Sequence, residues 1–407
     1  MRRVAIVASH PIQYQAPWFQ ALAGVCDLTV FFCHRQDADG QARAGFGVAF
    51  DWDVPLLDGY RFEWLENVAA DPGVERFAGC DTPSVEAGLA LGDFDACIVN
   101  GWYLKSYVQA IRACRRLGVP LLMRGDSHLN SPRPLVWRAA KYLPYRWLVS
   151  RADAHLHVGQ ANREYLAHYG VPADRLFFVP HFVDNGRFAA AAAAAHAVGE
   201  VGRLRAAWKA GPDATVFVFA GKLIALKRVV DFVEAVAAAA RTHAVRGVVV
   251  GAGPEDAALR RRAAELGAPV HFEGFHNQST IASRYAAADC LVLPSGRESW
   301  GLVINEAMAA GRPAIVSDAV GCAPDLIDAG RTGWVFPVGD VDALAARMVS
   351  MAEQLARDRS RVEADVRRRI GTYSCAAAVQ GTMQAVEAVL APADRARKAQ
   401  LAGAPHG

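Results

Sequence analysis

Short apolar runs alternate with helical patterns along the whole chain, and this alternation restricts the fold more than any other feature. The stretches between the runs carry the 3.6-residue period of helices, as in 107–117. Apolar strands that alternate with helices form parallel sheets covered on both faces, so we predict an α/β fold. The predicted strands are 4–8, 28–32, 96–99, 121–123, 154–158, 176–179, 216–220, 248–250, 270–272, 290–293 and 314–316.

The chain is long enough for two domains. Its 407 residues are 53% hydrophobic, which suffices for two separate cores. An alanine run that begins after Phe188 suggests a surface connection between them. We therefore predict an N-terminal domain at 1–185, a connection at 186–212, a C-terminal domain at 213–372, a last helix at 373–390 and a loose tail at 391–407.

Charge and cysteine content restrict the partners and the compartment. The net charge is only +3 and no basic tail is present, so nucleic acid is not an expected partner. The eight cysteines form no CxxC pair, which favours buried free thiols in a reducing cytoplasm over zinc or dithiol sites. No apolar stretch reaches the length of about 18 residues that a spanning helix needs, and we expect a cytoplasmic protein.

The most informative segment for function runs from Ser295 to Gly311. Two carboxylates, Glu298 and Glu306, stand eight positions apart around the sequence Ser299-Trp300-Gly301-Leu302, which reads as the start of a helix after a buried strand. The first turn of a helix has unpaired N–H groups and a partial positive charge, so it attracts anions. A ligand with a sugar, a diphosphate and a ribose would suit this layout.

This segment resembles the E-x7-E signature of family 4 glycosyltransferases, and the resemblance extends from about Arg151 to Val338. It implies the GT-B fold, in which two Rossmann-like domains face each other across a cleft, with the last helix crossing back to the first domain. It also implies transfer of a sugar from a nucleotide-diphosphate sugar to a hydroxyl acceptor with retained configuration, in the assembly of a bacterial surface polysaccharide or glycolipid. No cofactor beyond this co-substrate is expected.

The resemblance assigns a donor site to the C-terminal domain. Lys222 and Lys227 match the two cations that grip the diphosphate, with Lys222 where relatives carry arginine, and two cations on one strand-to-helix turn would stabilise a departing diphosphate. Glu306 would hold the ribose hydroxyls and Glu298 the hydroxyls of the sugar, while the N–H groups of 300–302 face sugar and phosphate. The expected catalytic residues here are Lys222, Lys227 and Glu298, and the expected donor-binding residues are Gly221, Arg228, Gly251, Gly253, Phe275, His276, Ser299, Trp300, Gly301, Leu302 and Glu306.

The N-terminal domain carries fewer signals. Relatives place a donor-touching histidine near the end of the strand at 121–123, and either Asp126 or His128 could fill that catalytic place. We expect His10, Gln13 and Arg124 on the acceptor side, because they too follow or end predicted strands. D-x-D triplets, which bind a metal-nucleotide in another glycosyltransferase fold, occur here four times in unrelated contexts, so no metal is predicted.

Residues 135–148 mix aromatic, aliphatic and basic side chains. Such a stretch can lie on the inner face of the membrane and meet a lipid-linked acceptor, or it can be an amphipathic helix packed on its own domain. Two other functions stay open: a nucleotide-sugar epimerase of the same fold, and a nucleotide-sugar-binding protein without catalysis.

Overall fold

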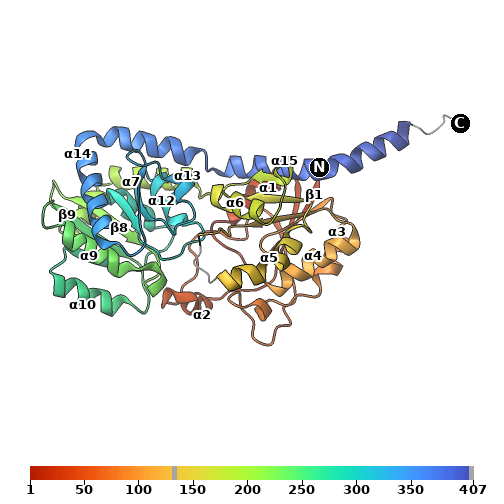
Figure 1. Cartoon of the computed structure of the whole chain (residues 1–407), viewed down its shortest axis with the longest axis horizontal. Coiled ribbons are helices and arrows are strands. Elements are labelled where there is room, and N and C mark those ends of the chain that lie inside the picture. Colours follow the sequence, from red (N-terminus) through yellow and green to blue (C-terminus); the bar gives the residue numbers. More distant parts are fainter. Residues whose placement is uncertain (131–134, 403–407) are drawn as a thin grey trace. The chain divides into compact units, whose positions relative to one another are not determined.

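The computed structural model describes the backbone of residues 1–130 and 135–402, and all their side chains except those of 44, 46, 135, 137, 138 and 392–402. The chain forms two compact units (Figure 1). Unit 1 comprises Met1–Gln36, Leu56–Pro180 and the helix that begins at Cys375. Unit 2 comprises Asp37–Pro55 and His181–Ser374.

Unit 1 contains a seven-stranded parallel sheet with the strand order β3-β2-β1-β4-β5-β6-β7. The order reverses direction between β1 and β4, which in an open α/β sheet is where ligands bind, beyond the carboxyl ends of the strands. The strands are β1 (Arg3–Ala8), β2 (Asp27–Phe32), β3 (Arg61–Trp64), β4 (Ala96–Val99), β5 (Leu121–Gly125), β6 (Ala154–His157) and β7 (Leu176–Phe178).

Helices cover both faces of this sheet (Figure 1). On one face α1 (Ala16–Ala23) packs against α15 (Cys375–Ala402), which also contacts β6 and β7. The Trp18 indole N–H donates to the Thr382 hydroxyl at 3.3 Å, and the Arg2 guanidinium pairs with Glu387 at 2.8 Å. The C-terminal helix is therefore part of unit 1. The other helices of the unit are α3 (Val85–Gly92), α4 (Lys105–Leu117), α5 (Leu135–Val149) and α6 (Gln160–His168).

Unit 2 contains a six-stranded parallel sheet with the order β10-β9-β8-β11-β12-β13. Its direction reverses between β8 and β11, so the expected ligand site lies beyond the carboxyl ends of these two strands. The strands are β8 (Thr215–Ala220), β9 (Val245–Val250), β10 (Val270–Gly274), β11 (Cys290–Leu293), β12 (Ala314–Ser317) and β13 (Gly333–Phe336).

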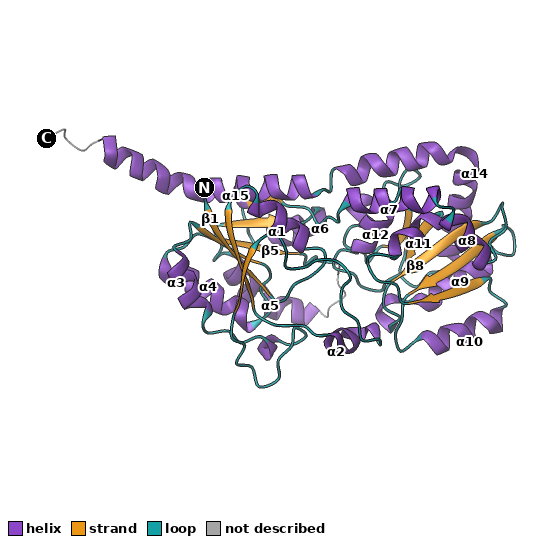
Figure 2. Cartoon of the chain, turned by 180° about the vertical axis from the view of Figure 1, so that it is seen from behind, coloured by secondary structure: helices purple, strands orange, loops and turns teal. Residues whose placement is uncertain are grey.

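The helices of unit 2 also lie on both sides of its sheet (Figure 2). One group consists of α9 (Val229–Ala239) and α10 (Asp256–Leu266), which contact each other. A second group contains α11 (Ile281–Ala287) and α12 (Leu302–Ala309), together with α7 (Asn185–Ala197) and α8 (Glu200–Ala207). The remaining helices are α2 (Ala38–Gln41), α13 (Ala323–Leu326) and α14 (Val341–Gly371).

The predicted α/β architecture is confirmed, and each predicted strand lies on an observed one. Two strands, β3 and β13, carried no recognisable signal. Neither is a continuous buried apolar run: β3 alternates exposed and half-buried residues, and β13 begins with Gly333 and has half-buried residues in its middle. The strand pattern that identifies interior strands is a continuous apolar run, which edge strands do not need.

The observed division of the chain differs from the predicted one in three places. Residues 181–212 belong to unit 2, because α7 and α8 pack on α11 and bury Phe188 and Trp208 completely. The alanine run is thus a packed helix and not a surface connection. Residues 37–55 also belong to unit 2, although they stand between β2 and β3 of unit 1. Finally, α15 continues to Ala402, beyond the predicted end at 390.

The cysteines follow the expectation: all eight are free, and seven of them are buried. None of the helices in the described part of the chain combines the length and the apolar character that crossing a bilayer requires.

Candidate functional site

The loops that follow β8, β9, β10 and β11 meet at the carboxyl edge of the unit 2 sheet. Backbone hydrogen bonds join neighbouring loops: Gly221 N–H donates to Val250 at 3.0 Å, Gly251 N–H to Gly274 at 2.7 Å, and Gly296 N–H to Leu226 at 2.9 Å. All the donor residues predicted in the C-terminal domain lie on these loops or on α12. The structure therefore brings them to one edge of one sheet.

Two glycines make the closest approach of these loops possible. Gly251 and Gly253 have φ angles of +153° and +156°, a region that residues with a Cβ rarely adopt. A Cβ at Gly251 would lie 1.8 Å from the Gly221 carbonyl oxygen, and one at Gly253 would lie 2.5 Å from that of Leu223. Any larger residue would push the β8 and β9 loops apart.

An ion pair joins the two parts of the predicted motif. The Lys227 ammonium, at the end of a short turn after β8, contacts the Glu298 carboxylate on the loop before α12. Each side chain is 19% exposed, so the pair lies at the surface of the site and remains open to a ligand. A cation and a sugar-binding carboxylate predicted from separate segments are thus direct neighbours.

The other two predicted cations differ in their surroundings. Lys222 is half-buried on the loop after β8. Arg228 adopts a left-handed backbone conformation (φ +50°) and its guanidinium binds Asp231 at 2.6 and 3.1 Å. Because Asp231 is only 3% exposed, it anchors Arg228 to the start of α9. The guanidinium of this expected donor-binding residue is therefore already engaged by the first turn of α9.

The start of α12 has the geometry expected of an anion site. Gly301 precedes the helix with a φ of +104°, and Ile304 N–H donates back to its carbonyl at 2.9 Å. The peptide N–H groups at the start of an α-helix have no partner within the helix. The preceding loop is tied to the β12 loop, since Gly321 N–H donates to the Glu298 carbonyl at 3.0 Å.

The side chains near the start of α12 differ in their exposure. Ser299 is exposed and Leu302 is half-buried. Trp300 is 2% exposed, and its indole N–H donates to the Asn305 side chain at 2.8 Å. Its ring lies 5.6 Å from His181 and 5.9 Å from Tyr373. Only the backbone of Trp300 can therefore serve the ligand, while the indole packs in the interior.

Glu306 is held in a buried polar network. The Tyr285 hydroxyl donates to one carboxylate oxygen at 2.7 Å and the Gln278 amide to the other at 3.0 Å. Arg187 in turn donates to the Gln278 side-chain oxygen at 2.6 Å. Glu306 is only 2% exposed, and its role as a ribose ligand stays a prediction. Tyr285, Gln278 and Arg187 were missed by the sequence analysis, because no local sequence pattern marks them.

The loop after β10 carries Phe275 and His276, both half-buried. The His276 ring contacts Glu273 at 3.0 Å, and burial, together with the charge of Arg284, lowers the pKa of His276. Burial would raise the pKa of Glu273, but the hydrogen bond from Trp208 and the charges of Arg284 and His276 outweigh it and lower that pKa. His276 thus holds this loop to Glu273.

The residues predicted in the N-terminal domain lie at the carboxyl ends of β1 and β5 in unit 1. Arg124 is 4% exposed, lies 4.9 Å from the Trp18 ring centre and donates to the Pro180 carbonyl at 3.4 Å. Burial lowers the pKa of Arg124 to about 10, against the charge of Asp126. Asp126 is half-buried and His128 is buried, and both remain candidates for the donor-touching residue.

His10 and Gln13 follow β1, and both are half-buried. The His10 ring contacts the Ser9 hydroxyl at 3.0 Å. Burial, with a smaller effect of His34, lowers the pKa of His10 to about 4, so the ring is neutral at physiological pH. As a neutral imidazole, it can accept or donate a hydrogen bond but supplies no charge to an acceptor.

Four aspartates of the D-x-D triplets accept hydrogen bonds from backbone N–H groups. Asp37 and Asp340 cap the starts of α2 and α14, Asp53 accepts from the Ser279 backbone, and Asp95 accepts from the Arg3 backbone. Among the residues that the structure describes, no group of three or more His, Cys, Asp or Glu side chains is arranged to hold a metal ion.

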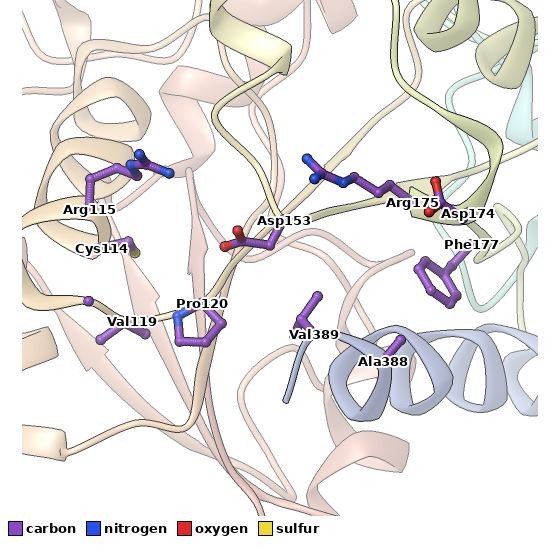
Figure 3. Close-up of a pocket in the computed structure, with 11 residues that line it drawn as sticks. Cys114, Arg115, Val119, Pro120, Asp153, Asp174, Arg175, Phe177, Ala388 and Val389 are labelled. Carbon is purple, nitrogen blue, oxygen red and sulfur yellow. The ribbon is translucent and has the colours of Figure 1, made fainter. Parts of the chain in front are cut away.

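A cavity of about 550 Å³ lies elsewhere in unit 1, at the amino ends of β5, β6 and β7 (Figure 3). Arg115 and Arg175 extend toward the space above Asp153, whose carboxylate accepts from the Leu121 N–H at 2.8 Å. Ala388 and Val389 of α15 form part of its wall. None of the predicted site residues lines it, and it lies at the opposite edge of the unit 1 sheet from His10 and Arg124.

Comparison with known proteins identifies the family. The family model described as glycosyl transferases group 1 matches residues 214–354, which include the loops of the candidate site. A D-inositol 3-phosphate glycosyltransferase of Actinosynnema mirum is 33% identical over 381 residues, covering 82% of this chain and 84% of that protein. The chain belongs to the group 1 glycosyltransferases.

Other relatives match over shorter regions. A GDP-mannose-dependent alpha-mannosyltransferase of Mycobacterium tuberculosis is 33% identical over 266 residues, 64% of each chain. For three further relatives the match spans only 29% to 35% of their length. The shared regions therefore establish the family more firmly than they indicate any one substrate.

Solved structures establish the fold. The Anabaena protein HepE in complex with UDP has a TM-score of 0.70 at 16% identity, covering 95% of this chain and all of that chain. The predicted fold class is confirmed: the chain has the two-domain α/β fold of the GT-B glycosyltransferases.

Proposed function

We propose that the chain transfers a sugar from a nucleotide-diphosphate sugar to a hydroxyl acceptor, with retention of configuration. The ion pair between Lys227 and Glu298 carries this proposal. It joins a cation suited to a diphosphate with a carboxylate suited to sugar hydroxyls, beside the first-turn N–H groups of α12. A ligand that combines a diphosphate with a sugar satisfies all three groups at once.

The catalytic task in this proposal is to stabilise the leaving group. Negative charge builds on the diphosphate as its bond to the sugar breaks, and Lys222, Lys227 and the start of α12 stabilise that charge. Glu298 orients the sugar through its hydroxyls and at the same time fixes the position of Lys227. The diphosphate must share Lys227 with Glu298, so its arrival weakens an ion pair that is already formed. The reaction in this form needs neither a metal nor a further cofactor.

The names of the relatives support a nucleotide sugar as donor and leave the base open. One relative is named for GDP-mannose, whereas HepE was solved with UDP and with UDP-glucose. The buried Glu306 and the half-buried Phe275 would meet ribose and base. We place the acceptor on unit 1, where Arg124, His10 and Gln13 lie at the carboxyl ends of the strands.

We further propose that the acceptor is a glycan or a lipid-linked glycan of a bacterial surface polymer, reached from the cytoplasm at the inner face of the membrane. The support is α5, where Val136, Leu143 and Trp147 are 77%, 72% and 58% exposed. Their spacing places them on one side of the helix. The Arg151 guanidinium lies 4.3 Å from the Trp147 ring centre, and an exposed apolar face with basic neighbours suits an anionic membrane surface.

A screen of UDP-, GDP- and ADP-sugars by thermal shift tests the donor, because a ligand that binds the folded state raises its melting temperature. The Lys227→Ala variant should lose the shift, whereas Lys209→Ala, at an exposed position of unit 2, should keep it. Release of nucleoside diphosphate only when an acceptor is present distinguishes transfer from epimerisation. Donor binding without any turnover would favour a non-catalytic protein, and the absence of any shift would refute the proposed donor site.

A further inference from the structure

Residues Asp37–Pro55, which we call the strap, leave unit 1 after β2 and join unit 2. The strap is fixed at its far end by side chains of the loop after β10. The Asn277 side chain donates to the Asp51 carbonyl at 2.8 Å, and the Ser279 N–H donates to the Asp53 carboxylate at 3.1 Å. The Ser279 hydroxyl also donates to Asp53. These bonds hold the strap on the candidate site.

The strap crosses three loops of the donor site in order. Gly45 and Gly47 have φ angles of +101° and +70°. A Cβ at Gly45 would lie 3.4 Å from the Lys222 side chain, and a Cβ at Gly47 would lie 3.5 Å from the Gly253 Cα. The strap thus passes over the β8 loop and then the β9 loop before it reaches the β10 loop. Its path follows the part of the site assigned to the nucleotide.

Aromatic rings gather where the strap meets the β10 loop. The Phe50 ring lies 4.4 Å from the Phe275 ring, at an angle of 39°, and the Trp52 ring lies 4.9 Å from Phe50, perpendicular to it. All three residues are half-buried, so part of this aromatic surface stays accessible. A separation of 4.4 Å leaves no room for a base between Phe50 and Phe275, so a base can meet these rings only on the sides that they do not turn toward each other.

We propose that the strap is part of the donor site and that Phe50, together with Phe275, forms the surface on which the nucleobase stacks. This inference rests on the proposed function, since it requires a nucleotide donor. Aromatic side chains bind bases of every kind through stacking. Phe50 then determines the affinity for the nucleoside part of the donor, while Lys222 and Lys227 bind the diphosphate. Asp53 is a positioning residue, which acts by holding the strap on Ser279.

Titration calorimetry with UDP, GDP and ADP on the full chain tests the proposal. The Phe50→Ala variant should bind the preferred nucleotide about tenfold more weakly, the loss expected for one base–aromatic stack. Phe50→Tyr keeps an aromatic face and should bind as the unaltered chain does. Phe50→Leu fills similar space without that face and should resemble Phe50→Ala. Phe77→Ala, at a 54% exposed phenylalanine of unit 1, is the matched control and should bind normally.

Three results would overturn the proposal. Equal affinity of Phe50→Ala and the control would show that Phe50 does not meet the base. Tighter binding by Phe50→Ala would show that the strap blocks the site. Full recovery by Phe50→Leu would indicate a spacer without stacking. If the unaltered chain binds none of the three nucleotides, the proposed function itself fails, a result distinct from a failure confined to Phe50. Thermal melting of each variant checks that the strap substitutions leave the units folded.

Discussion

The network around Glu306 allows its structural and functional roles to be separated by experiment. In Glu306→Ala, the Tyr285 hydroxyl and the Gln278 amide lose their acceptor inside the protein, where they are 0% and 6% exposed. The Gln278 amide cannot turn to compensate, because Arg187 holds its oxygen. A buried donor without a partner costs about 1–3 kcal/mol, so the two together should destabilise unit 2 by about 3 kcal/mol.

Glu306→Gln should behave differently. Its side-chain oxygen can accept from Gln278, and its amide can donate to the Tyr285 hydroxyl, which then acts as acceptor. Both hydrogen bonds survive without the charge, at a cost of about 1 kcal/mol. For a unit of this size 1 kcal/mol corresponds to about 2–4 °C of melting temperature, so we expect a decrease of about 6–12 °C for alanine and about 2–4 °C for glutamine.

The assays are thermal melting by circular dichroism and donor binding by calorimetry. Glu265→Ala, at a side chain 54% exposed on α10, is the control and should melt within about 2 °C of the unaltered chain. If Glu306 also holds the ribose hydroxyls, Glu306→Gln should weaken donor binding although it melts almost normally. A Glu306→Ala variant that melts like the control would refute the network argument, and unchanged donor affinity in Glu306→Gln would refute the ribose role.

Three further predictions concern charge, pH and membranes. Lys227→Met should weaken binding of nucleoside diphosphates at least about tenfold in calorimetry, because a hydrogen bond from a charged group contributes about 1.5–3 kcal/mol; unchanged affinity would show that the diphosphate lies elsewhere. Burial lowers the pKa of His155 from 6.5 to about 4, so the folded state favours the neutral ring. The free energy of unfolding should therefore fall as pH decreases from about 6.5 to 4, by up to about 3 kcal/mol from this residue. In urea unfolding, the stability of His155→Gln should depend less steeply on pH than that of the unaltered chain. An equal pH dependence of the two would contradict the conclusion that burial keeps His155 neutral. Trp147→Glu should reduce flotation with anionic liposomes at low salt, and an unaltered chain that does not float would end the membrane hypothesis.

The interior of both sheets could be predicted because their strands are buried on both faces and are therefore continuously apolar. The strands β3 and β13 could not, since β3 alternates exposed with half-buried residues and β13 begins with a glycine. The sequence also did not reveal that residues 37–55 belong to unit 2. Their decisive contact pairs Asp51 with Asn277, 226 positions apart, and neither residue belongs to a pattern that reveals the other.

The candidate site shows the same limit. Residues such as Lys227 and Glu298 were predictable, because the carboxyl ends of parallel strands share one edge and a family motif marks them. Tyr285 and Gln278 were not, because they act on Glu306 from another helix and from its preceding loop, where tyrosine and glutamine are common. The burial of the Trp300 indole could likewise not be predicted from the sequence, since its partners His181 and Tyr373 come from distant parts of the chain.

The assignment of α15 to unit 1 has a consequence for how the protein is made. The ribosome releases the residues of the second sheet before the helix that covers β6 and β7 has been synthesised. Until then Trp18 lacks its Thr382 partner, and one face of the first sheet lacks its cover. The sheet of unit 2 can therefore form while unit 1 still lacks α15.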